Sequence, residues 1–118
     1  MNSTKLPILS RACFGLLRFT GGFQERFGDK APAITFNLFQ RFTQNDWGTI
    51  CEEDKEANAR DIEFHLLLDG RFVDAFRLMG SYEVEGETVW VISYVSHKPS
   101  KQLNPDVCNT CVLLPSEY

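Results

Sequence analysis

Four cysteines and two histidines supply the side chains that most readily bind a metal or attack a substrate. Cys108 and Cys111 form a Cys-x-x-Cys pair, but no second pair completes a four-ligand zinc site. His97 lies eleven residues before Cys108 and is the candidate for a third ligand. If this segment is a strand, however, the odd spacing points the two thiols to opposite faces. We therefore predict no metal and no cofactor, and reduced, half-buried cysteines at Cys13, Cys51, Cys108 and Cys111.

Neither histidine is accompanied by the groups that catalysis requires. His65 lies beside three leucines near the end of a predicted helix, and His97 lies in a predicted surface loop. No serine or cysteine nucleophile is placed with either of them in the sequence. The chain also lacks a glycine-rich phosphate loop, a His-Glu-x-x-His motif and a nucleophile elbow. An enzymatic activity is therefore not the favoured prediction.

The sequence Asp46-Trp47-Gly48 directly precedes a predicted helix and has two interpretations. In the first, Asp46 and Trp47 line a ligand cleft near the helix N-terminus, with His97 as a third member. In the second, Trp47 fills the core and Asp46 hydrogen-bonds the turn. The second interpretation is favoured, because tryptophan buries a large area and aspartate readily forms turns.

Acidic residues occur in two groups. Glu83, Glu85 and Glu87 alternate and would share one face of an extended segment. Such a row either discourages sheet pairing at a solvated edge or, with Tyr82, forms a surface for a basic partner. The other group is Glu52, Glu53, Asp54 and Glu56, at the start of a predicted helix. These negative charges complement the positive end of the helix dipole, and their spacing is not that of a calcium-binding loop.

The clearest predicted helix runs from Ile50 to about Leu68. Thr49 and Glu52 have the spacing of a capping box, and Gly70 provides a left-handed end. A shorter helix is expected over Phe23 to Phe27, with Thr20 as its cap. The segment from Ala33 to Phe42 is ambiguous, since its apolar alternation favours a strand whereas Pro32 and the Leu38–Phe42 spacing favour a helix.

The remaining apolar segments predict strands. One strand is expected from Cys13 to Phe19 in the first half, and three follow in the second half. A turn region around Gly80 to Gly86 should join the first two of these three, which are Arg71 to Met79, Thr88 to Val95 and Val107 to Leu114. The predicted fold class is α+β, with N-terminal helices packed on an antiparallel sheet formed mainly by the C-terminal half.

Length and charge limit the classes of protein to which the chain can belong. Its 118 residues, 43% of them hydrophobic, predict a single compact domain over residues 1–118. A net charge of −4 disfavours non-specific binding to a phosphate backbone, so direct nucleic-acid binding is not expected. No apolar run is long enough for a membrane span and no secretory signal is evident, so we expect a cytoplasmic protein.

Several motifs, in order along the chain, resemble a family of small, uncharacterised bacterial proteins often labelled plasmid-related. The family has a Gly-Asp-Trp-Gly motif and ends in Leu-Leu-Pro-Glu-Glu-Tyr; the matching stretches here are 45–48, 52–58, 70–72, 90–93 and 113–118. Leu17 to Gly22 also resembles the family's opening strand and turn. The resemblance favours a helix for the ambiguous segment and implies a mobile genetic element.

The chain departs from the family pattern at two places. Phe42 stands where members carry histidine, and Asn45 replaces the first glycine of the motif. Where members carry Asp-Arg after a strand, a longer loop contains Ser96, His97 and Lys98. Any site that the family builds from those residues is absent here, and the resemblance implies no catalytic role.

The favoured functional hypothesis is a small, acidic, non-enzymatic binding protein of a plasmid, phage or other mobile element. Its partner would be a host protein, such as a nucleic-acid-handling complex with basic grooves, which makes an inhibitor of host defence (anti-CRISPR or anti-restriction) a concrete version. The predicted partner-binding residues are Tyr82, Glu83, Glu85 and Glu87. The alternative is a small ligand-binding or enzymatic domain with a cleft near Asp46, Trp47 and His97. A homodimer with paired sheet edges is a third hypothesis.

Overall fold

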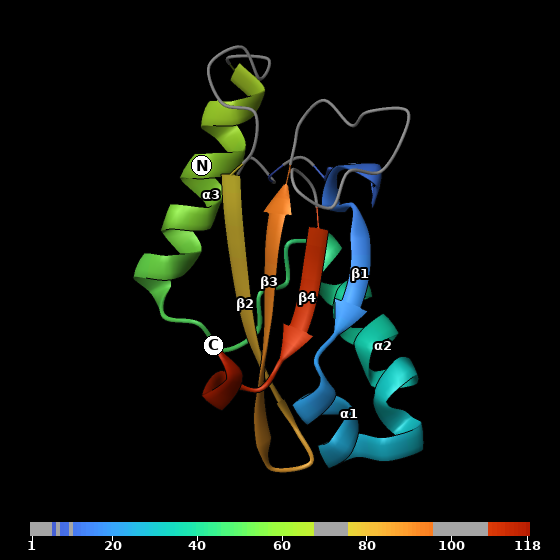
Figure 1. Ribbon diagram of the computed structural model, residues 1–118. Helices are drawn as coiled ribbons and strands as arrows, with labels where there is room; N and C mark the ends of the chain where they lie inside the picture. The colour runs from blue at the N-terminus through green and yellow to red at the C-terminus, as the bar shows by residue number, and fades with distance from the viewer. Residues whose placement is uncertain (1–5, 7, 10, 68–75, 96–108) are drawn as a thin grey trace.

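The computed structural model describes residues 6, 8–9, 11–67, 76–95 and 109–118. Three α-helices and four strands form its framework (Figure 1), together with short 3-10 turns at 11–14, 28–30 and 115–117. In chain order these elements are β1 (Leu16–Phe19), α1 (Gly21–Phe27), α2 (Ala31–Thr43), α3 (Glu52–Leu67), β2 (Phe76–Val84), β3 (Glu87–Val95) and β4 (Asn109–Leu113).

The four strands form one sheet in the order β1-β4-β3-β2. The three C-terminal strands pair antiparallel, as predicted, whereas β1 pairs parallel with β4 through the register Leu16↔Asn109. The fold is therefore α+β, with a mixed sheet built mainly by the second half of the chain, and the predicted fold class is confirmed.

The core lies between the sheet and the helices α1 and α2, which lie behind the sheet in Figure 1. Phe14 packs edge-on against Phe39 and Phe42 of α2, with ring centroids 5.9 Å apart in both pairs. Fully burying a phenylalanine stabilises the folded state by about 2–3 kcal/mol relative to exposing it. The third helix, α3, runs beside β2 (Figure 1), where the Asn58 side-chain amide donates to the Met79 carbonyl at 2.9 Å.

The ambiguous segment is helical, as part of α2. Pro32 occupies its first turn, where the missing N–H costs nothing. Ala31, Leu38 and Phe42 are buried at helical spacing, while Phe36 is 50% exposed. A strand would have buried Phe36 together with Ile34 and Leu38, so the strand interpretation is wrong because burial follows a period of 3.6 residues.

The predicted long helix forms, but without its capping box. It begins at Glu52, and the Thr49 hydroxyl donates to the Ser81 carbonyl of β2 at 3.2 Å instead of capping α3. His65 falls within α3, and Gly70 lies outside the described residues. The shorter helix α1 is capped as predicted, because the Phe23 amide donates to the Thr20 hydroxyl at 3.3 Å.

The strand boundaries differ from prediction in two places. Only Leu16–Phe19 of the first predicted strand is extended, since residues 11–14 form a 3-10 turn. The predicted turn region from Gly80 is wrong up to Val84, because β2 continues to that residue. Glu85 and Gly86, with φ of 51° and 79°, then make the positive-φ turn that joins hairpin strands. The start of the strand predicted from Arg71 lies outside the described residues.

Within the described ranges, none of the helices combines the length and the apolar composition needed to cross a bilayer.

Candidate functional site

The backbone around Asp46-Trp47-Gly48 forms hydrogen bonds with β2. The Ser81 amide donates to the Trp47 carbonyl at 3.0 Å, and the Thr49 amide donates to the Ser81 carbonyl at 2.7 Å. Gly48 forms a parallel bridge with Ser81 and has a φ of 72°, a conformation that favours glycine. A Cβ at Gly48 would also collide with the Ser81 carbonyl oxygen. The motif is therefore a backbone clamp on β2.

This arrangement confirms the structural interpretation of the motif. Trp47 is only 6% exposed and belongs to the core, and Asp46 accepts the Gly48 amide at 3.1 Å within the turn. His97, the third residue of the predicted cleft, lies outside the described residues.

Asp46 also belongs to a charged cluster with Arg41 and Tyr82. The Arg41 Nε donates to the Asp46 carboxylate at 2.7 Å, and its guanidinium lies 4.8 Å from the centre of the Tyr82 ring. The hydrogen bond from Arg41 holds the pKa of Asp46 below its ordinary value and raises the pKa of Arg41. The Tyr82 hydroxyl donates to the Asp46 carbonyl at 2.7 Å, and burial raises the pKa of this hydroxyl.

Tyr82 therefore differs from its predicted role as a surface residue. It is 1% exposed, because even-numbered residues of β2 face the helices α1 and α2. The sequence places Tyr82 beside the glutamates in an extended segment, but it does not show which face of that segment is buried. A partner could reach the glutamates but not the Tyr82 ring.

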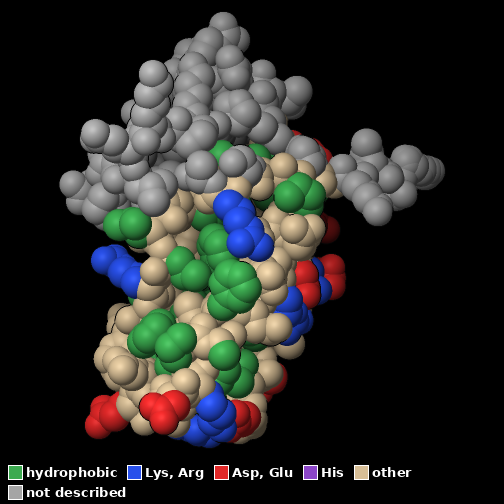
Figure 2. Space-filling model, turned by 90° about the vertical axis from the view of Figure 1, so that its right-hand side faces the viewer, with side chains coloured by type: hydrophobic (Ala, Val, Ile, Leu, Met, Phe, Trp, Pro, Cys, Tyr) green, Lys and Arg blue, Asp and Glu red, His purple; other side chains and the backbone are tan. Residues whose placement is uncertain are grey.

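The three glutamates do not form one row, because Glu85 lies in the hairpin turn. Glu85 pairs with Lys30 at 2.7 Å, and Glu87 pairs with Arg26 at 2.8 Å. The hydrogen bond from Lys30 lowers the pKa of Glu85. In Figure 2, acidic and basic side chains lie next to one another at the lower end of the molecule, where α1 and the β2–β3 turn are located.

Glu83 is the exception among these carboxylates. It is exposed and accepts a hydrogen bond from the Thr88 hydroxyl at 2.7 Å. Within the described part of the chain it forms no ion pair. Of the three glutamates, Glu83 is thus the one whose charge has no cationic neighbour inside the described fold.

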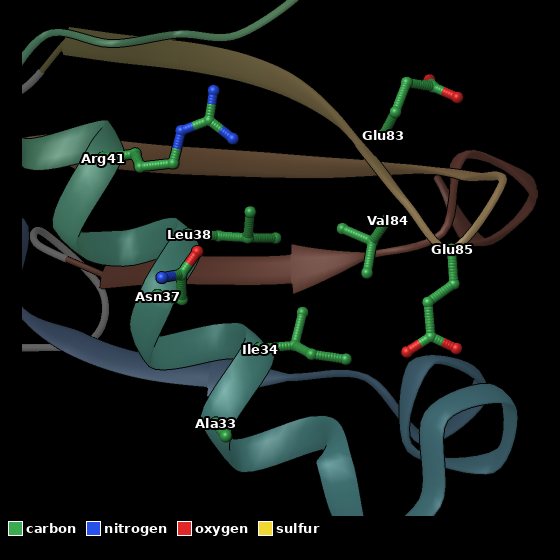
Figure 3. A pocket seen from close by; sticks show the side chains of 8 residues that line it. All are labelled: Ala33, Ile34, Asn37, Leu38, Arg41, Glu83, Val84 and Glu85. Atoms are coloured by element: carbon green, nitrogen blue, oxygen red, sulfur yellow. The ribbon is translucent and has the colours of Figure 1, made fainter.

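A groove of about 430 Å³ lies between α2 and the β2–β3 hairpin, and Glu83 is at its edge. The Glu83 carboxylate itself points away from α2, toward the open face of the sheet, where it accepts from Thr88 (Figure 3). Figure 3 shows Ile34 and Leu38 of α2 pointing toward Val84 of β2, so the floor of the groove is apolar. Arg41 lies at one end, and the two glutamates lie on the hairpin side. The residues that line this groove are Ala33, Ile34, Asn37, Leu38, Arg41, Glu83, Val84 and Glu85.

The sequence prediction missed the helical wall of this groove. Ile34, Asn37, Leu38 and Arg41 follow the i, i+3, i+4, i+7 spacing of one helix face. That signal was present, but it identifies a wall only once the segment is known to be a helix. Pairing this wall with Glu83 and Val84 required the tertiary structure.

The other candidate residues form no site with one another. The acidic residues at the start of α3 are all exposed, and Glu52 lies 3.6 Å from Lys55. Cys13 is buried, Cys51 is exposed and Cys111 is half-buried, so the predicted half-burial holds for Cys111 alone among these three, while Cys108 falls outside the described residues. Across the described ranges, no three side chains of the metal-binding types gather closely enough to hold an ion.

The C-terminal motif of the resemblance has a structural role. The Glu117 carboxylate accepts hydrogen bonds from the Thr20 hydroxyl, from the Gly22 amide at 3.0 Å and from the Leu114 amide at 3.0 Å. The bond from Thr20 is the largest cause of a lowered pKa at Glu117. Glu117 thus connects the end of the chain to the start of α1, at the turn 20–22.

Comparison with models of known protein families, with curated proteins and with solved structures finds no match for this chain. The resemblance to the plasmid-related family therefore stays a prediction.

Proposed function

We propose that this chain is a non-enzymatic binding protein that docks a basic segment of a partner protein in the groove between α2 and the β2–β3 hairpin. The observation that carries the proposal is that an apolar floor ends at the edge strand β2, on whose outer side a carboxylate has no ion-pair partner among the described residues. Glu83 supplies that carboxylate, and Ile34, Leu38 and Val84 supply the floor.

The charges around the groove indicate which side chains a partner segment would carry. Arg41 is paired with Asp46, and Glu85 is paired with Lys30, so these groups are neutralised within the fold. Glu83 leaves one negative charge on the outer side of β2, beside the groove. A segment with an apolar side chain beside a lysine or arginine would satisfy both features, because charge complementarity orients a partner while apolar burial supplies affinity.

A host protein with a basic surface, such as a nucleic-acid-handling complex, fits this requirement. Together with the resemblance to plasmid-related proteins, this supports an inhibitor of host defence, such as an anti-CRISPR or anti-restriction protein. The alternative cleft near Asp46, Trp47 and His97 is less well supported. Arg41 pairs with the Asp46 carboxylate, and the Trp47 ring is buried and therefore not available to a ligand.

The proposal is tested by capturing partners from a lysate of the source organism with tagged wild-type protein and two groove variants. Glu83→Lys reverses the charge beside the groove, and Asn37→Arg places a large side chain in the groove. We expect each variant to weaken binding of the partner by at least about tenfold, which is about 1.4 kcal/mol. The affinities would be measured by calorimetry with the purified partner.

Two matched variants control for charge and bulk away from the groove. Glu53→Lys makes the same charge change on the exposed surface of α3, and Gln24→Arg makes a similar size change at an exposed position of α1. Both should bind like wild type. If all four variants bind alike, or if size-exclusion chromatography shows only a homodimer with no captured protein, the groove is not a partner site.

A further inference from the structure

The sheet has a second face, on the side opposite α1 and α2, which is turned toward the viewer in Figure 1. Strand register determines which side chains share this face, because residues two apart along a strand lie on the same side. One row across it is Leu16, Asn109, Tyr94 and Arg77, and the next row is Arg18, Cys111, Ile92 and Met79.

Aromatic rings gather on this face. Tyr94 on β3 is 47% exposed, and Trp90 lies four residues earlier on the same strand, about 13 Å away along it. Tyr118 is 67% exposed and packs edge-on against Trp90, with ring centroids 5.8 Å apart. The face therefore offers accessible π-surface on a rigid sheet.

Arginines flank these rings on both sides. Arg77 of β2 is the cross-strand neighbour of Tyr94 and donates to the Tyr118 hydroxyl at 2.7 Å. Arg18 of β1 lies beside the Cys111 thiol, whose pKa burial raises. Within the described residues, neither arginine forms an ion pair. Arg77 is held against Tyr118 by this hydrogen bond and by a cation–π contact of 5.5 Å, so its charge is fixed beside the rings.

Two side-chain carboxylates of the described residues lie near this face. Glu117 accepts hydrogen bonds from residues 20, 22 and 114, and its charge acts on the Cys111 thiol. The Glu83 carboxylate, which accepts from Thr88 on this face, lies six residues along β2 from Arg77, about 20 Å away. Arg77 and Tyr94 are therefore at the end of the face that is far from Glu83.

We infer that this face, defined by Arg18, Arg77, Trp90, Tyr94 and Tyr118, binds a short single-stranded nucleic acid. Bases stack on aromatic side chains held on a sheet, and arginines neutralise the phosphates beside them. A second copy of the chain would also bury the exposed rings, and the test below distinguishes it, because a dimer would form without the oligonucleotide. A purely acidic protein segment would satisfy the arginines but leave the rings without stacking partners.

The overall charge of −4 limits the strength of this binding but does not exclude it. Net charge governs long-range attraction, whereas stacking acts at contact. With two arginines on phosphates, log affinity should fall with log salt at a slope of about −1.4 for a single strand. This inference goes beyond the proposed function, since it concerns a different surface and a different class of ligand.

The test measures the fluorescence anisotropy of a labelled twelve-nucleotide oligo(dT) and of the matching oligo(rU) with the full-length protein. Tyr94→Ala should weaken binding at least about fivefold, whereas Tyr94→Phe, which keeps the ring, should bind nearly as well as wild type. Arg18→Ala should reduce the salt slope by about 0.7. Trp90 fluorescence should be quenched on binding, while Trp47 is shielded in the core.

Phe64→Ala and Arg60→Ala are the matched controls, because both residues are exposed on α3 and belong to none of the strands that form this face. Neither should change the affinity. Absence of binding at low salt, or equal losses in Tyr94→Ala and Phe64→Ala, would overturn the inference. Displacement of the oligonucleotide by polyglutamate as effectively as by unlabelled oligo(dT) would also overturn it, in favour of a site for an acidic protein. Since none of these measurements uses the protein partner, their failure is distinguishable from failure of the groove proposal.

Discussion

Gly48 combines two requirements at one position, a positive φ and a close approach to the neighbouring strand. Its φ of 72° is unfavourable for side chains other than glycine, and a Cβ would meet the Ser81 carbonyl oxygen. We expect Gly48→Ala to lower the free energy of unfolding by at least about 2 kcal/mol. Urea denaturation followed by circular dichroism would measure the change.

Gly21 provides the control for that substitution. It begins α1, and no atom lies within 4 Å of the Cβ that alanine would add. Gly21→Ala should therefore leave stability unchanged or raise it slightly, because alanine is the better helix former. Equal effects of the two substitutions would show that Gly48 does not act as a clamp.

Single residues were predictable where chemistry alone determined their environment. The burial of Trp47 and the turn hydrogen bond of Asp46 followed from their side-chain types. The ion pairs of Glu85 and Glu87 did not, because their partners lie about sixty residues away in the sequence. Tyr82 was assigned to the surface because the sequence around it did not show which face of β2 would be covered.

At the scale of elements, the C-terminal turn and α1 depend on each other through Glu117. Hydrogen bonding holds the pKa of Glu117 below its unfolded value, with Thr20 as the largest cause. A lowered folded-state pKa contributes stability above the unfolded value of about 4.3, and this contribution is lost as the pH falls through the folded value. The stability of the wild type should therefore decline on acidification below about pH 5.

Glu117→Gln isolates this contribution from those of the other carboxylates. Asp46 and Glu85 also have lowered pKa values and add to the same acid-side decline. The variant should be less stable than wild type at pH 7, and the two stability curves should converge at low pH. Parallel curves from pH 7 to pH 2, measured by urea denaturation, would contradict a role for the Glu117 charge.

The elements themselves were largely predictable, and their boundaries were less so. The first turn of α3 carries strong helix signals, and the spacing of Thr49 and Glu52 predicts a cap at Thr49. The Thr49 hydroxyl instead bonds β2, and a local sequence pattern cannot indicate such a tertiary contact. The segment of α2 is ambiguous in the sequence, because its apolar residues fit both the alternation of a strand and the spacing of a helix face. Packing against the sheet shows that the helical period is the correct one.

At the scale of the whole molecule, the overall charge conceals two surfaces of different character. Glu83 lies at the turn end of β2 beside the groove, whereas Arg77 lies at the other end of the same strand and Arg18 lies on the opposite edge strand. Composition reports only the sum, so it predicted an acidic protein with no direct contact to nucleic acid. The separation of these charges arises from their positions along β2 and from the strand order, which places β1 and β2 at opposite edges of one sheet.

These two surfaces should act independently. Asn37 of α2 lines the groove on the helix-covered side of the sheet, whereas Tyr94 is exposed on the open side. At 0.15 M salt, Asn37→Arg should weaken capture of the protein partner without changing oligo(dT) affinity, and Tyr94→Ala should do the reverse. The free energies of the double variant should equal the sum of the single effects within about 0.5 kcal/mol.

Titrations of wild type, both single variants and the double variant with each ligand would measure this independence. A variant that weakens both ligands while retaining its urea midpoint would show that the groove and the sheet face belong to one binding surface. In that case the partner would contact the hairpin from both sides, and the arginines and Glu83 would face different parts of a single molecule. Additive effects would instead indicate a protein that can hold a basic segment and a nucleic-acid strand at the same time.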